Sequence, residues 1–460
     1  MWSGPGLCCG VRPQSCSRPE IRRDSPRLAA RDFVSGRLKR RASRPIGGTW
    51  GALEPTFRRR GGHASRPDGL IVGAGFAGSV SARTLAEEHG LRVLVIDRRP
   101  HIGGNAHDQP DEHGILVHAY GPHIFHTNAE RVVAFLSRFT AWRPYEHRVV
   151  AEVGGRFVPM PINRRTVQAL HGVQLAGEDE TAAYLASLAE PREAMHTSED
   201  AVLAKVGRDL YERLFRGYTR KQWDLDPSQL HASVCARIPV RANDDDRYFS
   251  DSFQQMPADG YTAMFERILD HPNITVRTGV DYDEVKDEHK GSALVCSGPI
   301  DAFFGYRYGK LRYRSLRFEH EVRATHGGRL VQPTATVNYP NERIAYTRVT
   351  EYRHLTGQDA EVSTLAYEFP SAEGDPYYPI PRPENRALYH RYEQLAADRP
   401  DVLFVGRLAR YQYLNMDQVV AGTLAAVERW PLLAPDSDTD ADTDADTDSD
   451  TDSDTDDLAA

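Results

Sequence analysis

The feature that most constrains the fold is a glycine-rich turn between a short apolar run and a helical stretch. Leu70-Ile71-Val72 is typical of a buried strand, and Gly73-Ala-Gly75-Phe76-Ala-Gly78 follows it at once. A helical pattern then extends to residue 88, and a second apolar run at 92–96 ends in Asp97. Strand, glycines, helix, strand and acid in this order predict a βαβ unit that binds a dinucleotide.

The residues of this turn have separate expected roles in cofactor binding. Gly73 allows the tight turn, Gly75 lets the backbone approach a pyrophosphate, and Gly78 lets the helix pack closely on the strand. Phe76 begins the helix, whose free N–H groups attract an anion. Asp97 is placed to accept a hydrogen bond from a ribose hydroxyl.

A second glycine pair, Gly103-Gly104, follows soon after the acid and directly precedes Asn105. Backbone that passes this close to an extended cofactor is typical of FAD proteins rather than NAD dehydrogenases. We therefore expect FAD, with Arg98, Gly104 and Asn105 among the residues that bind it. A simple hairpin turn at the glycine pair remains the alternative interpretation.

Composition narrows the class of protein without naming a partner. A chain of 460 residues with a net charge of −8 predicts two or three structural units and no bulk attraction to nucleic acid. Apolar runs stay far below the ~18 residues of a membrane-spanning helix, so we expect a soluble, cytoplasmic protein. Cys235 and Cys296 lack metal-ligand spacing, and His123 and His126 have no third ligand nearby, so we expect no metal.

The two ends of the chain differ from the rest. Residues 1–67 are rich in Arg, Ser, Gly and Pro without a periodic apolar pattern, and we expect a disordered extension, with a targeting peptide as the alternative. Asp alternates with Thr, Ser and Ala from Asp436 to Asp457, which predicts a disordered acidic tail over 433–460.

Ordered motifs across roughly residues 70–430 resemble the bacterial UDP-galactopyranose mutase family, FAD enzymes that interconvert UDP-galactopyranose and UDP-galactofuranose. The resemblance rests on Ile102-Gly-Gly-Asn-Ala106, Tyr120-Gly-Pro-His-Ile-Phe-His-Thr127, Gly217-Tyr-Thr-Arg-Lys-Gln-Trp223, Arg237-Ile-Pro-Val-Arg241, Tyr248-Phe-Ser-Asp251, Gly298-Pro-Ile-Asp301, Tyr313-Arg-Ser-Leu316, Tyr346-Thr-Arg348, Pro376-Tyr-Tyr-Pro379 and Gly406-Arg-Leu408.

Apolar residues four apart predict a helix over 201–215 that ends before Gly217, so that the aromatic residues after it form a stacking platform. The resemblance implies that Tyr218 stacks on the uracil, Trp223 borders the sugar and Phe215 helps to wall the uridine pocket, and we add Thr219 to this set. Taken alone, an aromatic near a helix end is more typical of a core.

A diphosphate requires cations and phenol donors to hold it. The resemblance implies that Arg237, on a mobile loop, and Arg314 grip the diphosphate from two sides. It assigns hydrogen bonds to the phosphates to the phenols of Tyr248, Tyr346 and Tyr413. Taken singly, each of these residues would more often be a surface ion pair or a core tyrosine.

The resemblance also implies the residues around the flavin. It places the loop of His123 against the ring system, Arg407 near it, and the stretch that begins at Asn415 and Met416 at its pyrimidine edge, where a helix N-terminus stabilises negative charge. Asn415 stands where well-known bacterial members have Asp, and Asp417 stands where they have His. Both changes lie at the flavin edge, and Asn415 is the one that we expect to matter most for activity.

The implied reaction is an isomerisation in which N5 of reduced FAD attacks the anomeric carbon while Arg237 and Arg314 retain the departing UDP, with His123 beside the flavin. It supplies galactofuranose for cell-surface glycans. Two alternatives stay open: a sugar-nucleotide-binding flavoprotein with little turnover, and a flavin oxidoreductase on the same fold. The choice between UDP-galactose and UDP-N-acetylgalactosamine is also open.

The expected fold class is α/β, with a Rossmann-like FAD domain interleaved with a helical domain and a mostly antiparallel substrate sheet. We assign 68–160 and 401–432 to the FAD domain, 161–235 to the helical domain and 236–400 to the substrate sheet. The resemblance further implies a homodimer.

Overall fold

The computed structural model describes residues 66–433, and the predictions for 1–67 and 433–460 therefore lie almost wholly outside it. One of its two large sheets is parallel and five-stranded, in the order β10-β2-β1-β11-β17. Its strands are β1 (Gly69–Val72), β2 (Val93–Asp97), β10 (Ile274–Thr278), β11 (Ala293–Cys296) and β17 (Val402–Phe404). The first connection, through helix α1 (Phe76–Glu88), confirms the predicted βαβ unit.

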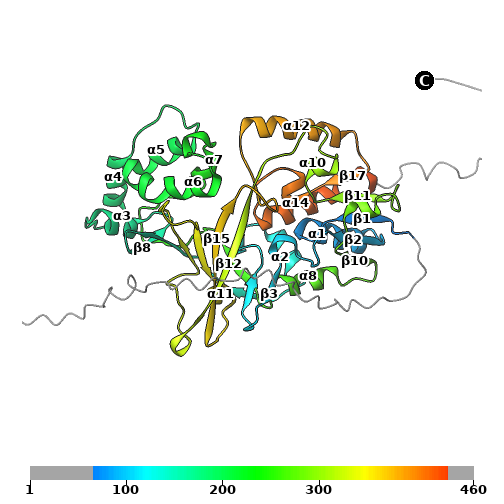
Figure 1. Ribbon diagram of the computed structural model, residues 1–460, viewed down its shortest axis with the longest axis horizontal. Helices are drawn as coiled ribbons and strands as arrows, with labels where there is room; N and C mark the ends of the chain where they lie inside the picture. Colours follow the sequence, from blue (N-terminus) through cyan, green and yellow to red (C-terminus); the bar gives the residue numbers. More distant parts are fainter. Residues whose placement is uncertain (1–65, 434–460) are drawn as a thin grey trace, which may run out of the picture. The chain divides into compact units, whose positions relative to one another are not determined.

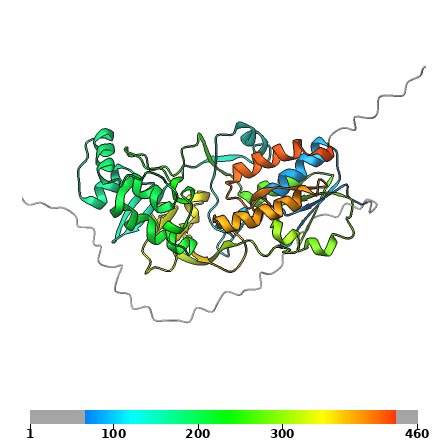
Figure 2. The same cartoon turned by 90° about the horizontal axis from the view of Figure 1, so that it is seen from above.

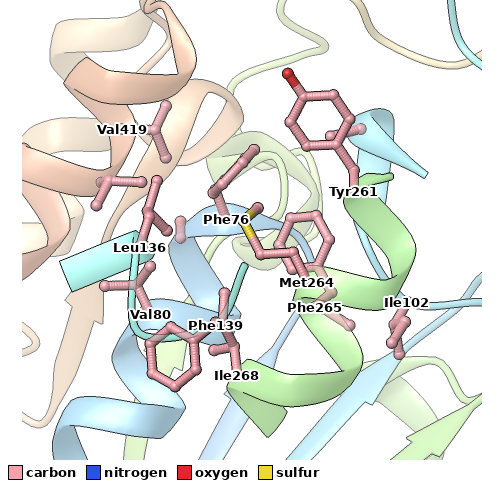
Figure 3. Close-up of a cluster of buried hydrophobic side chains, with 14 of the residues drawn as sticks. Phe76, Val80, Ile102, Leu136, Phe139, Tyr261, Met264, Phe265, Ile268 and Val419 are labelled. Atoms are coloured by element: carbon pink, nitrogen blue, oxygen red, sulfur yellow. The ribbon is translucent and has the colours of Figure 1, made fainter. Parts of the chain in front are cut away.

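Helices cover both faces of this sheet, and α1 packs against α14 (Met416–Glu428) and α8 (Tyr261–Leu269) (Figure 1). Figure 3 shows Phe76, the first residue of α1, inside the core between these helices. Its ring meets the edge of Phe265, with ring centroids 4.8 Å apart. The core therefore fixes the start of α1 at the turn that follows β1.

The second large sheet has seven strands in the order β16-β12-β15-β14-β13-β7-β8 and is antiparallel except for the β13–β7 pair. Its strands are β7 (Val149–Val153), β8 (Arg156–Met160), β12 (Tyr313–Ala324), β13 (Thr336–Asn338), β14 (Arg348–Glu351), β15 (Val362–Ser371) and β16 (Tyr378–Pro379). This mixed architecture confirms the predicted fold class. Strands β7 and β8 belong to it, although the sequence assignment gave 149–160 to the FAD domain.

A helical group packs on β7 and β8 around a second core. It consists of α3 (Arg164–His171), α4 (Glu178–Leu188), α5 (Ser198–Leu210), α6 (Gly217–Trp223) and α7 (Ser233–Ala236). Figures 1 and 2 show this group and the parallel sheet on opposite sides of the long strands β12 and β15.

The expectation that the chain leaves its helix before Gly217 was wrong. A π-helical turn, Tyr211–Arg216, joins α5 to α6, and helical backbone continues to Trp223. Gly217 itself has helical dihedrals, and a Cβ there would lie 2.3 Å from the carbonyl oxygen of Pro340. Glycine at this position therefore permits a close approach of another segment and does not end the helix.

The remaining elements connect these parts. Two small sheets pair β3 (Asp108–Pro110) with β4 (Leu116–His118), and β9 (Phe253–Pro257) with both β5 (Phe125–Thr127) and β6 (Trp142–Pro144). The other helices are α2 (Glu130–Leu136), α9 (Tyr282–Val285), α10 (Ile300–Phe303), α11 (Tyr352–Thr356), α12 (Pro383–Ala397) and α13 (Gly406–Ala409). Among residues 66–433, no helix has the length and apolar character needed to cross a bilayer.

Candidate active site

One continuous cavity of about 1060 Å³ extends from the carboxyl ends of the parallel strands to the helical group. The turn after β1, the end of β2 and the start of α14 line one part of it. Helix α6, the segment after α7 and strand β14 line the other part. The cavity thus lies at the carboxyl edge of the parallel sheet, which is where α/β proteins bind their ligands.

The glycine-rich part of the cavity fits a dinucleotide. A Cβ at Gly104 would lie 2.9 Å from the Cα of Gly75, and one at Gly78 would lie 1.8 Å from the carbonyl oxygen of Gly73. Gly73 has φ +102° and is equally crowded by Ser297. The cradle therefore admits backbone only, and α1 begins there without a side-chain cap, so its N–H groups are available to a pyrophosphate.

Asp97 holds this cradle together from the end of β2. Its carboxylate accepts hydrogen bonds from the backbone N–H of Ala74 and of Arg99, both at 2.9 Å. Arg98 and Arg99 both pair with Asp375, each with an N–O distance of 2.8 Å. Asp375 lies in the loop between β15 and β16, and it joins that loop to the rim of the cradle.

The loop of His123 forms another wall of the cavity. The Nδ1 of His123 lies 2.8 Å from the carbonyl oxygen of Gly121, which fixes this nitrogen as the donor and leaves Nε2 as an acceptor. Burial, together with the neighbouring His118, lowers the pKa of His123 to about 3. The imidazole is therefore neutral at physiological pH.

Helix α6 presents aromatic and polar side chains to the other part of the cavity. Tyr218, Thr219 and Trp223 line it from one helical face, and Phe215 lines it from the π-helical turn before α6. Burial raises the pKa of Tyr218, so its hydroxyl remains a donor. Such a wall can stack on a planar base and donate to a polar ligand.

Cations and phenols meet between the two parts. The guanidiniums of Arg237 and Arg407 lie 4.6 Å and 5.0 Å from the centre of the Tyr413 ring. Burial would raise the pKa of Tyr413, but these guanidiniums outweigh it and lower the pKa to about 8. The Nε of Arg407 is buried without a partner, which suits an arginine that awaits an acceptor on a ligand.

A third guanidinium lies deeper in the cavity. Arg348 lines it from the first position of β14, and its Nε donates to the carboxylate of Glu368 at 2.8 Å. Glu368 is buried on β15, with its second oxygen unpartnered. Because this ion pair engages only the Nε of Arg348, the two outer nitrogens of the guanidinium can serve a ligand.

Known proteins are similar to this chain both in the region of the glycine cradle and in the region of the substrate site. Family models for UDP-galactopyranose mutase and for an NAD(P)-binding Rossmann-like domain match residues 213–413 and 71–139. A probable UDP-galactopyranose mutase of Klebsiella pneumoniae is 41% identical over 372 residues, 78% of this chain and 94% of that protein. The chain belongs to the UDP-galactopyranose mutase family.

Another curated protein and a solved structure are also similar to this chain. The dTDP-fucopyranose mutase of Escherichia coli is 37% identical over 358 residues, 76% of this chain and 94% of that protein. A crystal structure of reduced UDP-galactopyranose mutase matches with a TM-score of 0.62 at 16% identity and covers 79% of this chain and 93% of that one. The family, the isomerase class and FAD as cofactor, all predicted from the motifs, are confirmed.

Within this family fold, the cavity gathers most of the residues that the sequence singled out, from elements far apart in the chain. Gly78 lies beside it and packs α1 on β1. The others line it: Gly73, Gly75, Phe76, Asp97, Arg98, Gly104, Asn105, His123, Phe215, Tyr218, Thr219, Trp223, Arg237, Tyr248, Arg407, Tyr413, Asn415 and Met416.

Arg314 and Tyr346 are not among the described residues that line the cavity. Arg314 is buried behind α6, where its Nε donates to the carbonyl of Gln222 at 3.1 Å. Tyr346 packs its ring on Tyr367, 5.1 Å between centroids. Their contacts with the diphosphate stay predictions.

Arg348 and Tyr378 line the cavity as well. The sequence reasoning missed both, although they belong to motifs already recognised, two residues after Tyr346 and inside Pro376-Tyr-Tyr-Pro379. Tyr378 stacks on Tyr413 with centroids 5.5 Å apart. Tyr378 is the cross-strand partner of Arg314 in the pairing of β16 with β12, and the Arg314 guanidinium turns instead to the carbonyl of Gln222.

The start of α14 carries the residues in which this chain departs from well-known members. The N–H of Asn415 donates to the side chain of Gln418 at 2.8 Å, and the helix begins at Met416. The carboxylate of Asp417 accepts from the hydroxyl of Thr127 at 2.9 Å. Asp417 thus holds β5 to α14 and does not line the cavity.

Proposed function

We propose that this protein interconverts UDP-galactopyranose and UDP-galactofuranose. The observation that carries the proposal is the single cavity, in which a glycine-lined cofactor cradle continues into a site with Arg237, Arg348 and several phenols. A flavin oxidoreductase acting on an apolar substrate would have no use for cations at this place. The relatives named as mutases support the same reaction.

FAD fits the cradle formed by Gly75, Gly104 and the start of α1, and when reduced it would supply a nucleophilic N5 for the anomeric carbon. Neutral His123 and the N-terminus of α14 face the same part of the cavity. A neutral imidazole adds no charge there, and the helix N-terminus stabilises negative charge on a reduced ring. The N-terminus of α14 therefore favours the reduced cofactor.

The substrate end handles the leaving group. Cleavage of the anomeric C–O bond concentrates negative charge on UDP, and the guanidiniums of Arg237 and Arg348 stabilise that charge. Tyr248, Tyr378 and Tyr413 add hydroxyl donors at the same wall. Because the ring-closed sugar must take UDP back, the cations must also keep UDP in place until the furanose has formed.

Tyr218, Trp223 and Phe215 serve as the platform for the uridine and the sugar. The helical domain, assigned to 161–235, carries this platform. We extend the proposal to a cytoplasmic homodimer whose product enters cell-surface glycans. The similarity to a dTDP-fucopyranose mutase makes that sugar nucleotide the natural competing substrate.

The test is turnover by the full chain loaded with FAD, with and without dithionite. UDP-galactofuranose and dTDP-fucofuranose are supplied in parallel, and the pyranose products are separated by chromatography. Conversion of UDP-galactofuranose only after reduction supports the proposal. Preference for the dTDP sugar, or no conversion of either by the reduced protein, contradicts it.

A further inference from the structure

Helix α6 has a second face that points away from the cavity. Tyr218, Thr219, Gln222 and Trp223 line the cavity, whereas Lys221 does not. At 3.6 residues per turn, these four positions span roughly 140° of the helix circumference, and Lys221 lies roughly 130° from the middle of that arc. Lys221 is partly buried on that opposite face, against the loop between β13 and β14.

The ammonium of Lys221 is surrounded by backbone carbonyls from that one loop. It donates to the carbonyl oxygens of Tyr339, Asn341, Ile344 and Tyr346 at 2.5, 3.1, 3.0 and 2.8 Å. An ammonium has three protons, so these four acceptors more than satisfy it. The loop is thus wound around a single charged group of α6.

Both ends of this loop carry residues of the substrate site. Asn338 precedes Tyr339, Arg348 follows Tyr346 by two residues, and Asn338 and Arg348 are paired in register across β13 and β14. Both line the cavity. The Lys221 ammonium therefore sets the distance between the aromatic wall of α6 and the arginine that faces it.

Close packing supports the same interface. A Cβ on Gly217 would lie 2.3 Å from the carbonyl oxygen of Pro340, so α6 and the loop touch backbone to backbone. Arg220, next to Lys221, reaches the same loop at its surface through Glu342, with an N–O distance of 3.2 Å and both side chains more than 40% exposed. The buried and the exposed contact can be removed separately.

We propose that Lys221 is a positioning residue for the sugar nucleotide: by gathering the β13–β14 loop against α6, it holds Tyr218 and Arg348 at the spacing that UDP requires. The inference rests on the proposed function, because it assigns the site between these residues to UDP. In this role Lys221 acts through the loop and does not itself contact the ligand.

Lys221→Met removes the charge and retains the bulk of the chain. We expect UDP to bind roughly tenfold more weakly and KM to rise more than kcat falls, since a base stack or phosphate contact that is shifted from its place loses much of its contribution to binding. FAD content and the rate of flavin reduction by dithionite should not change, because the loop does not reach the glycine cradle.

The matched control is Arg220→Gln, which removes the exposed contact of the same helix with the same loop. Gly217→Ala gives a second, independent disturbance that keeps Lys221 and pushes the loop away. Loss of UDP affinity in K221M and G217A but not in R220Q supports the proposal. UDP affinity within about twofold of wild type in a folded K221M, or equal losses in R220Q, would overturn it.

The readouts separate this proposal from the proposed function. UDP affinity is measured by titration and needs no turnover. Absence of mutase activity in the wild-type chain would therefore count against the reaction, whereas unchanged UDP affinity in K221M counts against the positioning role alone. Parallel loss of FAD in K221M would also overturn the proposal, because it would indicate general damage.

Discussion

Replacing Arg348 with methionine tests whether its guanidinium binds the diphosphate of UDP. Arg348 faces the cavity, whereas Arg314 is buried behind α6. A charge-assisted hydrogen bond contributes about 1.5–3 kcal/mol, so Arg348→Met should weaken UDP binding roughly 10- to 150-fold. Arg314→Met removes a comparable guanidinium outside the cavity and should leave UDP affinity far closer to that of the wild type.

Arg348→Met also leaves the Glu368 carboxylate buried without its ion-pair partner. Loss of one partner of a buried ion pair typically costs about 3–5 kcal/mol in the free energy of unfolding, and Glu368 is only 2% exposed. The double variant R348M/E368Q removes the unpaired charge and should recover much of that free energy. It should recover none of the UDP affinity, because the guanidinium is still missing.

Urea unfolding of the FAD-loaded protein measures the free energy of unfolding. Titration with UDP, followed by tryptophan and flavin fluorescence, measures UDP affinity. The reasoning fails if R348M binds UDP like the wild type. It also fails if R348M/E368Q regains UDP affinity along with stability, because the loss in R348M would then have come from distortion of the fold.

Three shorter predictions follow from other parts of the cavity. Because the pKa of Tyr413 is lowered to about 8, its hydroxyl is a donor below that pH and a repelling phenolate above it. UDP affinity should fall close to tenfold between about pH 7.5 and about pH 9, and an equally steep fall in Tyr413→Phe would refute the assignment. Gly104→Ala should lower FAD content in the purified protein, since a Cβ would lie 2.9 Å from Gly75; full occupancy would show that the cradle can open. Asp375→Asn should speed FAD release in a dilution assay by removing the partner of two arginines, while unchanged release would mean that its loop does not retain the cofactor.

The glycine cradle could be predicted because its determinants are local. Strand, turn and helix between Leu70 and Asp97 follow from periodicity within thirty residues or so, and the structure has them within a residue or two of the expected places. The end of the helix before Gly217 was predicted wrongly for the opposite reason. What Gly217 accommodates is the carbonyl of Pro340, more than a hundred residues away, which no local pattern reports.

The substrate arginines show a second limit of sequence reasoning. Arg314 and Arg348 both lie in strands, each close to a tyrosine, and both belong to recognisable motifs. Which of them lines the cavity depends on the segments that pack around each strand, and no local pattern reports these. Arg348 lines the cavity together with its cross-strand partner Asn338, whereas Arg314 donates to the carbonyl of Gln222 on α6 although its own partner, Tyr378, lines the cavity.

The order of the strands in the parallel sheet has a consequence for the synthesis of this protein on the ribosome. The glycine turn lies near the start of the described chain. However, α1 packs on α14 and β11 pairs with β17, and α14 and β17 both come from beyond residue 400. The emerging chain therefore contains its phosphate-binding turn for most of its synthesis without the elements that complete the cavity. FAD can be captured in its final site only after α14 has left the exit tunnel, so cofactor loading is a late event in biogenesis.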